Sequence, residues 1–171
     1  MRCGNSKSKS QPSPKVQGWV RELRNVWVRT KRHDYILFYV SRSTEIKKLD
    51  AALSKYVRKK FADKQGRVKC FTCGVSKSVE DMHCGHFMSR SAYSTRWLFN
   101  PEENITNVMP QCPRCNLYDS NQNYIFSRRL DEVFGEGTAD KVYTMSKQTR
   151  KYTIVEIVAM RKKFETLLND L

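Results

Sequence analysis

Cys70-Phe-Thr-Cys73 and Cys112-Pro-Arg-Cys115 are the two stretches that decide how this sequence folds. Each pair can bind one edge of a tetrahedral metal ion, and the 38 residues between them then form a loop that closes on the metal. Four thiolates leave no open coordination position, so the expected Zn²⁺ ion is structural and not catalytic. The alternative interpretations are a chance pairing and a redox-active dithiol.

The cellular compartment expected for this protein supports a metal site over disulfide bonds. The opening Met1 to Lys15 is polar and lacks the apolar centre of a secretory signal, and no stretch approaches the ~18 consecutive apolar residues of a membrane span. The sequence therefore predicts a cytoplasmic protein without a membrane partner. Paired cysteines in that compartment favour metal thiolates over disulfides, while Cys3 and Cys84 stand outside the pattern.

Basic residues are concentrated in the first two fifths of the chain. The formal net charge is +15; residues 1–69 hold 19 basic against 5 acidic residues, and residues 70–171 hold 13 against 12. Such an asymmetric field attracts a polyanion, and contacts with phosphates make binding depend on salt. Nucleic acid is the expected partner, with a solubilising tail as the alternative. Residues 1–15, rich in Ser, Lys and Pro, are expected to be disordered.

A helix is predicted from Thr44 to Asp63, because apolar residues recur at three- and four-residue spacing and the segment holds no Gly or Pro. The apolar positions are Ile46, Leu49, Leu53, Tyr56 and Val57. The other face carries a basic stripe of Lys47, Lys48, Lys55, Arg58 and Lys59. A solvated face is the ordinary interpretation of such a stripe; phosphate contact is the other, since acidic partners are scarce.

Further elements are predicted after this helix. They are a zinc knuckle over 67–74, a strand over 82–89, a helix from near Asn121 to Gly135, and a last helix from the capping box Thr153-Ile-Val-Glu156 to about Leu168. The last helix is expected to bury Ile157, Phe164 and Leu167, and the core to include Phe87, Trp97 and Phe99. For residues 16–42 the periodicity does not decide between strand and helix.

Polar side chains that suit phosphodiester hydrolysis lie between and beside the cysteine pairs. Such hydrolysis needs an activated water and a divalent cation that neutralises the charge building on the phosphate. A neutral imidazole with an ordinary pKa of ~6.5 suits the base, and His86 is the candidate. Asn116, directly after Cys115, offers a carbonyl oxygen suited to a hard cation. The alternative for His86 is a core histidine with satisfied hydrogen bonds.

The order of His86, Asn107 and Asn116 around the second cysteine pair resembles the HNH (His-Me finger) nucleases in their zinc-stapled form. Within that class, Leu49 to Leu168 is similar to the phage recombination proteins of the NinG type, also called Rap, which act as Holliday-junction nucleases. The shared features are the helix before Cys70, Gly85-His86 followed by an aromatic residue, Arg96 with Phe99 and Asn100, the block from Asn107 to Asn116, and the closing amphipathic helix. The first 45 residues are not covered by the resemblance.

The resemblance implies an α+β fold with a ββα-metal core, a four-cysteine zinc knuckle and flanking helices. It implies His86, Asn107 and Asn116 as the catalytic group, with Asn107 bracing a loop and not touching substrate. The catalytic Mg²⁺ or Mn²⁺ would be held by Asn116 and His83. Relatives often carry an acidic residue at the position of His83, and Asp81 is the nearby carboxylate. A histidine ligand shifts the preference from Mg²⁺ toward Mn²⁺, Zn²⁺ or similar ions.

The sequence thus predicts a basic, partly disordered extension over residues 1–45 and a zinc-stapled HNH-like nuclease domain over residues 46–171. The expected function is metal-dependent cleavage of DNA, branched as in a Holliday junction, during phage recombination in the host cell cytoplasm. A homodimer would match the two-fold symmetry of a junction. The alternatives are a zinc-finger DNA-binding protein without catalysis and a sequence-specific homing or restriction endonuclease.

Overall fold

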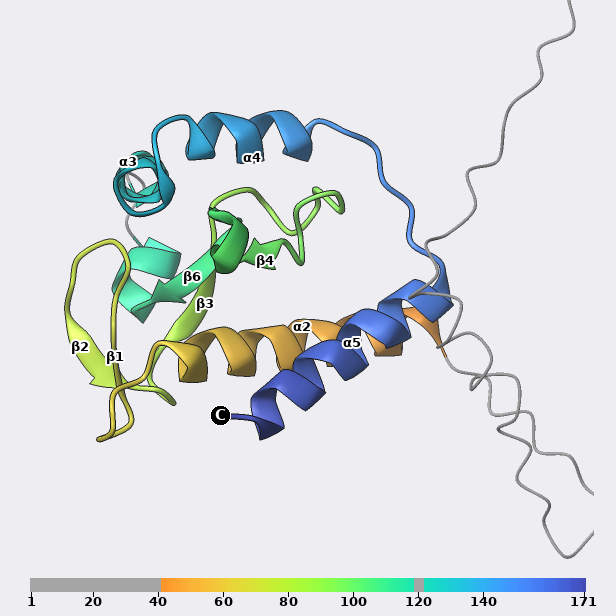
Figure 1. Ribbon diagram of the computed structural model, residues 1–171, viewed down its shortest axis with the longest axis horizontal. Helices are drawn as coiled ribbons and strands as arrows, with labels where there is room; N and C mark the ends of the chain where they lie inside the picture. Colours follow the sequence, from red (N-terminus) through yellow and green to blue (C-terminus); the bar gives the residue numbers. More distant parts are fainter. Residues whose placement is uncertain (1–40, 119–121) are drawn as a thin grey trace, which may run out of the picture. The chain divides into compact units, whose positions relative to one another are not determined.

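The computed structural model describes residues 41–118 and 122–171 of the chain. The disorder expected over residues 1–15, the undecided segment up to residue 40 and Cys3 lie outside these residues. The described part combines helices with short two-stranded sheets (Figure 1). The expected fold class is therefore confirmed at the level of an α+β fold with small sheets.

The described helices are α2 (Arg42–Lys60), α3 (Gln122–Phe134), α4 (Thr138–Ser146) and α5 (Ile154–Asn169), with two short helical turns, η2 (Pro101–Glu103) and η3 (Arg114–Tyr118). The strands form three antiparallel pairs: β1 (Arg67–Lys69) with β2 (Ser76–Ser78), β3 (His83–His86) with β6 (Val108–Gln111), and β4 (Phe99–Asn100) with β5 (Ile105–Thr106). In Figure 1 the β3–β6 pair lies between two helical layers, α2 beside α5 and α3 beside α4. Among the described residues, no helix is both long and apolar enough to cross a bilayer.

Helix α2 and helix α5 pack along each other through the first of two large apolar clusters. Helix α2 starts two residues before the predicted Thr44 and ends three residues before the predicted Asp63. The buried members are Leu49, Leu53, Tyr56, Val57, Trp97, Val108, Ile157 and Phe164. Burying one large apolar side chain contributes roughly 1.5–3 kcal/mol, so this cluster holds both helices against β6. Ile46 and Leu167 lie at its margin and are only partly buried.

The predicted capping box starts α5. The Thr153 hydroxyl accepts a hydrogen bond from the backbone N–H of Glu156 at 3.2 Å, and the Glu156 carboxylate accepts one from the backbone N–H of Thr153 at 2.7 Å. Two N–H groups that the helix itself leaves without partners are thereby satisfied. The start of α5 could therefore be located from sequence alone.

A buried carboxylate also joins α2 to α5. Glu45 is 2% exposed, and its two oxygens accept hydrogen bonds from Arg161 Nε at 2.9 Å and Lys48 Nζ at 2.8 Å. A charge at this depth is tolerated only when it is paired. The helical pattern places only apolar residues on this face, so the sequence did not indicate this ion pair.

Side chains of the β3–β6 pair alternate between the two helical layers. His83 lies opposite Gln111, Cys84 opposite Pro110, Gly85 opposite Met109 and His86 opposite Val108, without a bulge. Since successive side chains of a strand point to opposite faces, Cys84 and Val108 face the α2–α5 cluster while Met109 faces the α3–α4 cluster. Strand β3 spans His83 to His86, the centre of the strand predicted over 82–89.

The second cluster packs α3 and α4 against the other face of the β3–β6 pair. Its buried members are Phe71, Phe87, Met109, Phe126, Leu130, Ala139 and Val142. Helix α3 ends before Gly135, whose φ of +103° suits the predicted glycine cap. Helix α4 was not predicted, because it offers only Ala139 and Val142 as buried apolar residues. Its first turn is held by Asp131, whose Oδ1 accepts from the backbone N–H of Ala139 at 2.9 Å.

We predict that Glu45→Gln lowers the free energy of unfolding at neutral pH by about 1–3 kcal/mol, because two cations lose their buried acceptor. The hydrogen bond from Lys48 is the main reason that the pKa of Glu45 lies below its usual value. The stabilisation is therefore present above the unfolded-state pKa and is lost as pH falls through the lowered folded-state pKa. Urea denaturation at pH 7 and at pH 3 measures both effects.

The matched control is Glu165→Gln, because this more exposed carboxylate also pairs with Arg161, at 2.6 Å. It should cost less than about 1 kcal/mol. Equal losses in the two variants would show that the burial of Glu45 has no particular effect.

Candidate metal centre and active site

The four paired cysteines converge on one point. Their Sγ atoms all lie within 4.8 Å of one another, and Cys73 Sγ lies 3.8 Å from Cys112 Sγ. Zn–S bonds of about 2.3 Å in a tetrahedron require S–S separations of about 3.8 Å. The cluster of Cys70, Cys73, Cys112 and Cys115 therefore fits a Zn²⁺ ion.

Local backbone turns bring the thiols together. Cys70 and Cys73 lie in the loop between β1 and β2, where Gly74 takes a φ of +74° that favours glycine. The backbone N–H of Cys112 donates to Cys70 Sγ at 3.3 Å, which ties the knuckle to the end of β6. This bond joins residues that are 42 positions apart in the sequence and brings the two cysteine pairs into one cluster.

The thiols differ in acidity. Burial opposes ionisation of Cys70, but hydrogen bonds from the backbone of Cys73 and from the Thr72 side chain outweigh it and lower the pKa to about 6. Burial raises the pKa of Cys115 to about 12. A cluster with one easily ionised thiol suits a cation that displaces the remaining protons as it binds. Cys84 lies outside the cluster, and burial raises its pKa to about 12.

The end of β6 also brings together the two residues expected to hold the catalytic cation. After Cys112 the chain turns into η3, where the Asn116 N–H donates to the Cys112 carbonyl at 3.0 Å. The Asn116 side-chain amide lies 3.1 Å from Nδ1 of His83. Asp81, the carboxylate considered in its place, contacts Ser78 at 3.1 Å. The geometry therefore pairs Asn116 with His83.

His86 is held by a backbone carbonyl. Its Nε2 lies 3.1 Å from the carbonyl oxygen of Arg96, which can only accept, so Nε2 carries the proton and Nδ1 keeps the lone pair. Burial, and then the charge of Arg90, lowers the pKa of His86 below its ordinary value. The imidazole is accordingly neutral at physiological pH, which is the form that a general base requires.

His83 and His86 do not share a face. They are three residues apart on a regular strand, so their side chains project to opposite sides of the β3–β6 pair. His83 lies on the side of Gly85 and Gln111, and His86 on the side of Cys84 and α2. The expected base and the expected cation ligands are therefore separated by the strand itself.

The sequence of this chain matches one known protein family. The family model described as Bacteriophage Lambda NinG protein matches residues 9–171. The chain belongs to the NinG family. Neither a curated protein nor a solved structure shows significant similarity to it. The match begins well before Leu49, where the sequence resemblance began, so the family pattern extends into the N-terminal region that the resemblance did not cover.

In this NinG-family chain Asn107 is wholly buried. Its Oδ1 accepts from the backbone N–H of Met88 at 2.7 Å, and its Nδ2 donates to the carbonyls of Met88 and Thr95, each at 3.0 Å. All these bonds go to the loop that follows His86. Asn107 thus lies where it can brace that loop, away from solvent.

An ion pair that the sequence did not indicate orients the same loop. Asp50 on α2 accepts from Arg96 Nη2 at 2.6 Å and from Trp97 Nε1 at 2.7 Å. Arg96 Nη1 also donates to the carbonyl of Arg90 at 2.9 Å. Because the carbonyl of Arg96 holds His86, Asp50 positions the candidate base from a helix 36 residues earlier in the chain. Asp50 is the acidic residue in the middle of an otherwise mainly basic helix. This was the one feature of the sequence that could have indicated the ion pair.

One member of the predicted basic stripe is structural. Arg58 donates to the carbonyls of Val79 at 2.7 Å and Met82 at 3.2 Å, so it fastens α2 to the segment before β3. Of the interpretations left open for the stripe, the structure favours neither for Arg58 and adds a structural role, because its guanidinium is bound to backbone. Lys47, Lys55 and Lys59 of the stripe are exposed.

We predict that Cys112→Ser lowers the zinc content below one ion per chain and lowers Tm in parallel, because the remaining ligands cannot close the tetrahedron. Elemental analysis and thermal unfolding of the purified protein measure both. The control is Cys84→Ala, which removes a thiol outside the cluster and should retain one zinc ion. A wild-type protein without zinc, or a Cys112→Ser protein with full zinc, would contradict the assignment.

Proposed function

We propose that this chain is a metal-dependent DNA endonuclease of the HNH (His-Me finger) type, acting on branched DNA in phage recombination. The observation that carries the proposal is His86, a largely buried neutral imidazole whose Nε2 is bound to the Arg96 carbonyl and whose Nδ1 keeps its lone pair. A histidine held in one tautomer at the end of a strand suits proton abstraction from water.

The arrangement around the zinc knuckle supports a ββα-metal core. Strands β3 and β6 form its antiparallel pair, and η3 with α3 follows β6 and covers one face through Phe126 and Leu130. The cysteine cluster holds the end of β6 and the start of η3. The family match supports the phage assignment, and the resemblance to Rap-type nucleases supports the choice of a Holliday junction as substrate.

His83 and Asn116 fit a divalent cation. Asn116 Nδ2 donates to His83 Nδ1 at 3.1 Å, which leaves Asn116 Oδ1 and His83 Nε2 as the neutral donors that would suit Mn²⁺ or Mg²⁺, with water and phosphate oxygens in the remaining positions. When bound, such a cation neutralises the charge that builds on the phosphate during hydrolysis. Because both protein donors are neutral, the negative charge that balances the cation is expected to come from the DNA phosphates.

The strand geometry sets the roles of the two histidines. Three residues of strand at about 3.3 Å each put their Cα atoms roughly 10 Å apart, on opposite faces. A phosphodiester group that contacts both His83 and His86 must therefore lie across the edge of strand β3. His86 Nδ1 would therefore take a proton from water beside the phosphate, while His83 and Asn116 on the other side would hold the cation that binds the phosphate.

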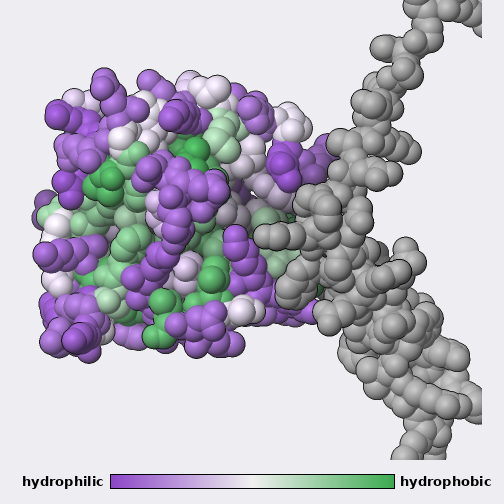
Figure 2. All heavy atoms as spheres, viewed as in Figure 1, coloured by the Kyte–Doolittle hydropathy of each residue, from purple (hydrophilic) through white to green (hydrophobic). Residues whose placement is uncertain are grey.

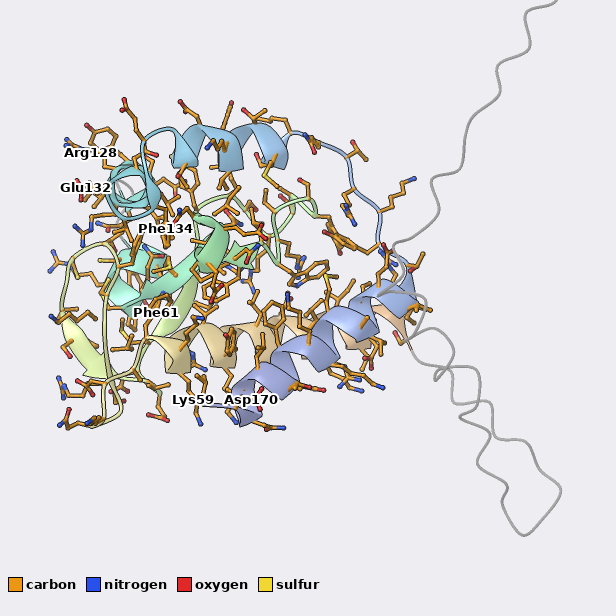
Figure 3. The ribbon with its side chains drawn as sticks, in the orientation of Figure 1. Lys59, Phe61, Arg128, Glu132, Phe134 and Asp170 are labelled. Carbon is orange, nitrogen blue, oxygen red and sulfur yellow. The ribbon has the colours of Figure 1, made fainter. Side chains whose placement is uncertain are left out.

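DNA backbone is expected to lie along the exposed lysines of α2. Lys47, Lys55 and Lys59 recur at intervals of eight and four residues on one helix face and make no ion pair with the described residues. Figure 3 shows Lys59 on the side of α2 away from the β3–β6 pair, near the end of α5 marked by Asp170. Hydrophilic side chains form most of the outline of the described part (Figure 2). This lysine stripe suits contact with phosphates without reading of bases.

A DNA-binding protein without catalysis is the second candidate. The placement of His83 and His86 on opposite faces favours it, because a compact hydrolytic site is easier to build on one face. The two candidates disagree about the effect of His86, so cleavage by a His86 variant decides between them.

We predict that His86→Ala lowers the rate of cleavage of a four-way junction by about 10²- to 10⁴-fold, while DNA affinity stays within about twofold. The wild-type rate should rise with pH through a pKa below about 6.5 and be level at neutral pH, because burial favours the neutral ring. A gel assay with Mg²⁺ or Mn²⁺ on a junction, a fork and a linear duplex measures rate and substrate preference together. Full activity in folded His86→Ala protein would exclude His86 as the base, and no cleavage by wild type would favour the binding protein.

We predict that replacing Lys47, Lys55 and Lys59 by Gln weakens DNA binding for all sequences alike. The slope of log affinity against log salt should flatten by about one unit for each phosphate that the variant no longer neutralises. The matched control replaces Lys141, Lys147 and Lys151, which removes the same charge from exposed positions outside the stripe. Equal effects in the two triple variants would show that net charge alone determines affinity.

A further inference from the structure

Gln111 crosses the strand pair and occupies the space above Gly85. A Cβ atom added at Gly85 would lie 1.8 Å from Gln111 Oε1 and 2.5 Å from its Cδ. Gln111 is paired with His83 in the register, and its side chain runs diagonally over the next position on the same face. Glycine at position 85 thus makes room for a carboxamide on the face that carries His83.

A hydrogen-bond relay from the zinc cluster orients this carboxamide. Gln111 Nε2 donates to the Thr72 hydroxyl at 3.3 Å, and that hydroxyl lies 3.2 Å from Cys70 Sγ. A metal-bound thiolate can only accept, so Thr72 must donate to sulfur and accept from Gln111. The amide is therefore fixed with Nε2 toward the knuckle and Oε1 toward the face of Gly85 and His83.

The oxygen held in this way has no donor among the described residues. Gln111 is 3% exposed, and no hydrogen bond from that part of the chain reaches its Oε1. This oxygen is not among the fully buried side-chain atoms that lack a partner, so water or a ligand can reach it. The polar neighbours on this face are His83 and Asn116, which contact each other at 3.1 Å.

We propose that Gln111 Oε1 is a third donor, with His83 and Asn116, to a divalent cation on this face, and that Thr72 couples its position to the structural zinc. The proposal rests on the proposed function for the cation and adds a residue that the sequence pattern did not indicate. Three neutral donors give weak binding to the free protein, which strengthens when phosphate supplies charge. Loss of zinc would release Gln111 and weaken the cation site without touching His83 or Asn116.

The test measures Mn²⁺ binding to zinc-loaded protein without DNA, from the decrease in the electron paramagnetic resonance signal of free Mn²⁺. Gln111→Met keeps the bulk over Gly85 and removes Oε1, and it should raise the Kd for Mn²⁺ at least tenfold. Thr72→Val removes the relay and leaves every donor in place, and it should raise the Kd about tenfold, as is typical of residues that orient a ligand. Thr72→Ser keeps the hydroxyl and should stay within twofold of wild type.

Gly85→Ala is a second, independent variant. The added Cβ displaces the far end of a flexible side chain and not backbone, so the fold and zinc content should survive while the Kd for Mn²⁺ rises. Zinc analysis and Tm of each variant separate this effect from unfolding.

The outcomes separate this inference from the proposed function. Wild-type Mn²⁺ affinity in folded, zinc-loaded Gln111→Met overturns the role of Gln111 and leaves the nuclease proposal standing. Failure of wild type to bind Mn²⁺ at millimolar concentration overturns the cation site itself. Weaker Mn²⁺ binding in Gln111→Met and Gly85→Ala, in a protein that cleaves no DNA, supports the cation site and contradicts the nuclease.

Discussion

The convergence of four thiols is the constraint on which the rest of this structure depends. It joins the loop after β1 to the end of β6, segments 39 residues apart, in a domain whose described sheets have two strands each. Sheets this small bury too little surface to hold their own register. With the ends fixed, β3 can pair with β6, η3 can begin just after Cys112, and α3 can pack over the face that carries Met109.

The same constraint organises the candidate site into two halves. On one face of the β3–β6 pair lie His83, Asn116 and Gln111, which are linked to the four clustered cysteines along the chain or through hydrogen bonds. On the other face lies His86, which is positioned by the Arg96 carbonyl and, through Arg96, by Asp50 of α2. The cysteine knuckle therefore supports the face with His83 and Asn116, while helix α2 supports His86, the candidate base.

The basic residues fall into two groups, arginines that are bound within the domain and lysines that are exposed. Arg58, Arg96 and Arg161 are largely occupied within the domain, where their planar guanidinium groups bind carbonyls and carboxylates in fixed geometry. The exposed lysines of α2 retain hydrated charges that suit a mobile contact with phosphates. Of these three arginines, only Arg58 belongs to the charge surplus before residue 70, so counting charges overstates the basic charge left free on that part of the surface.

The sequence by itself determined what depends on local spacing. The cysteine pairs, the apolar period of α2, the capping box of α5 and the glycine after α3 each act within a few residues, and all appear in the structure as expected. Residue types identified His86 and Asn116 as candidates for one site, and the resemblance to the HNH nucleases added His83 and Asn107. Only the tertiary structure decided which face each side chain takes, that Arg58 binds backbone, that α4 forms on two buried apolar residues, that Asp50 pairs with Arg96, and that Gln111 lies over Gly85. These depend on the register of β3 against β6 and on contacts between distant segments, and no local pattern in a single sequence encodes such pairings.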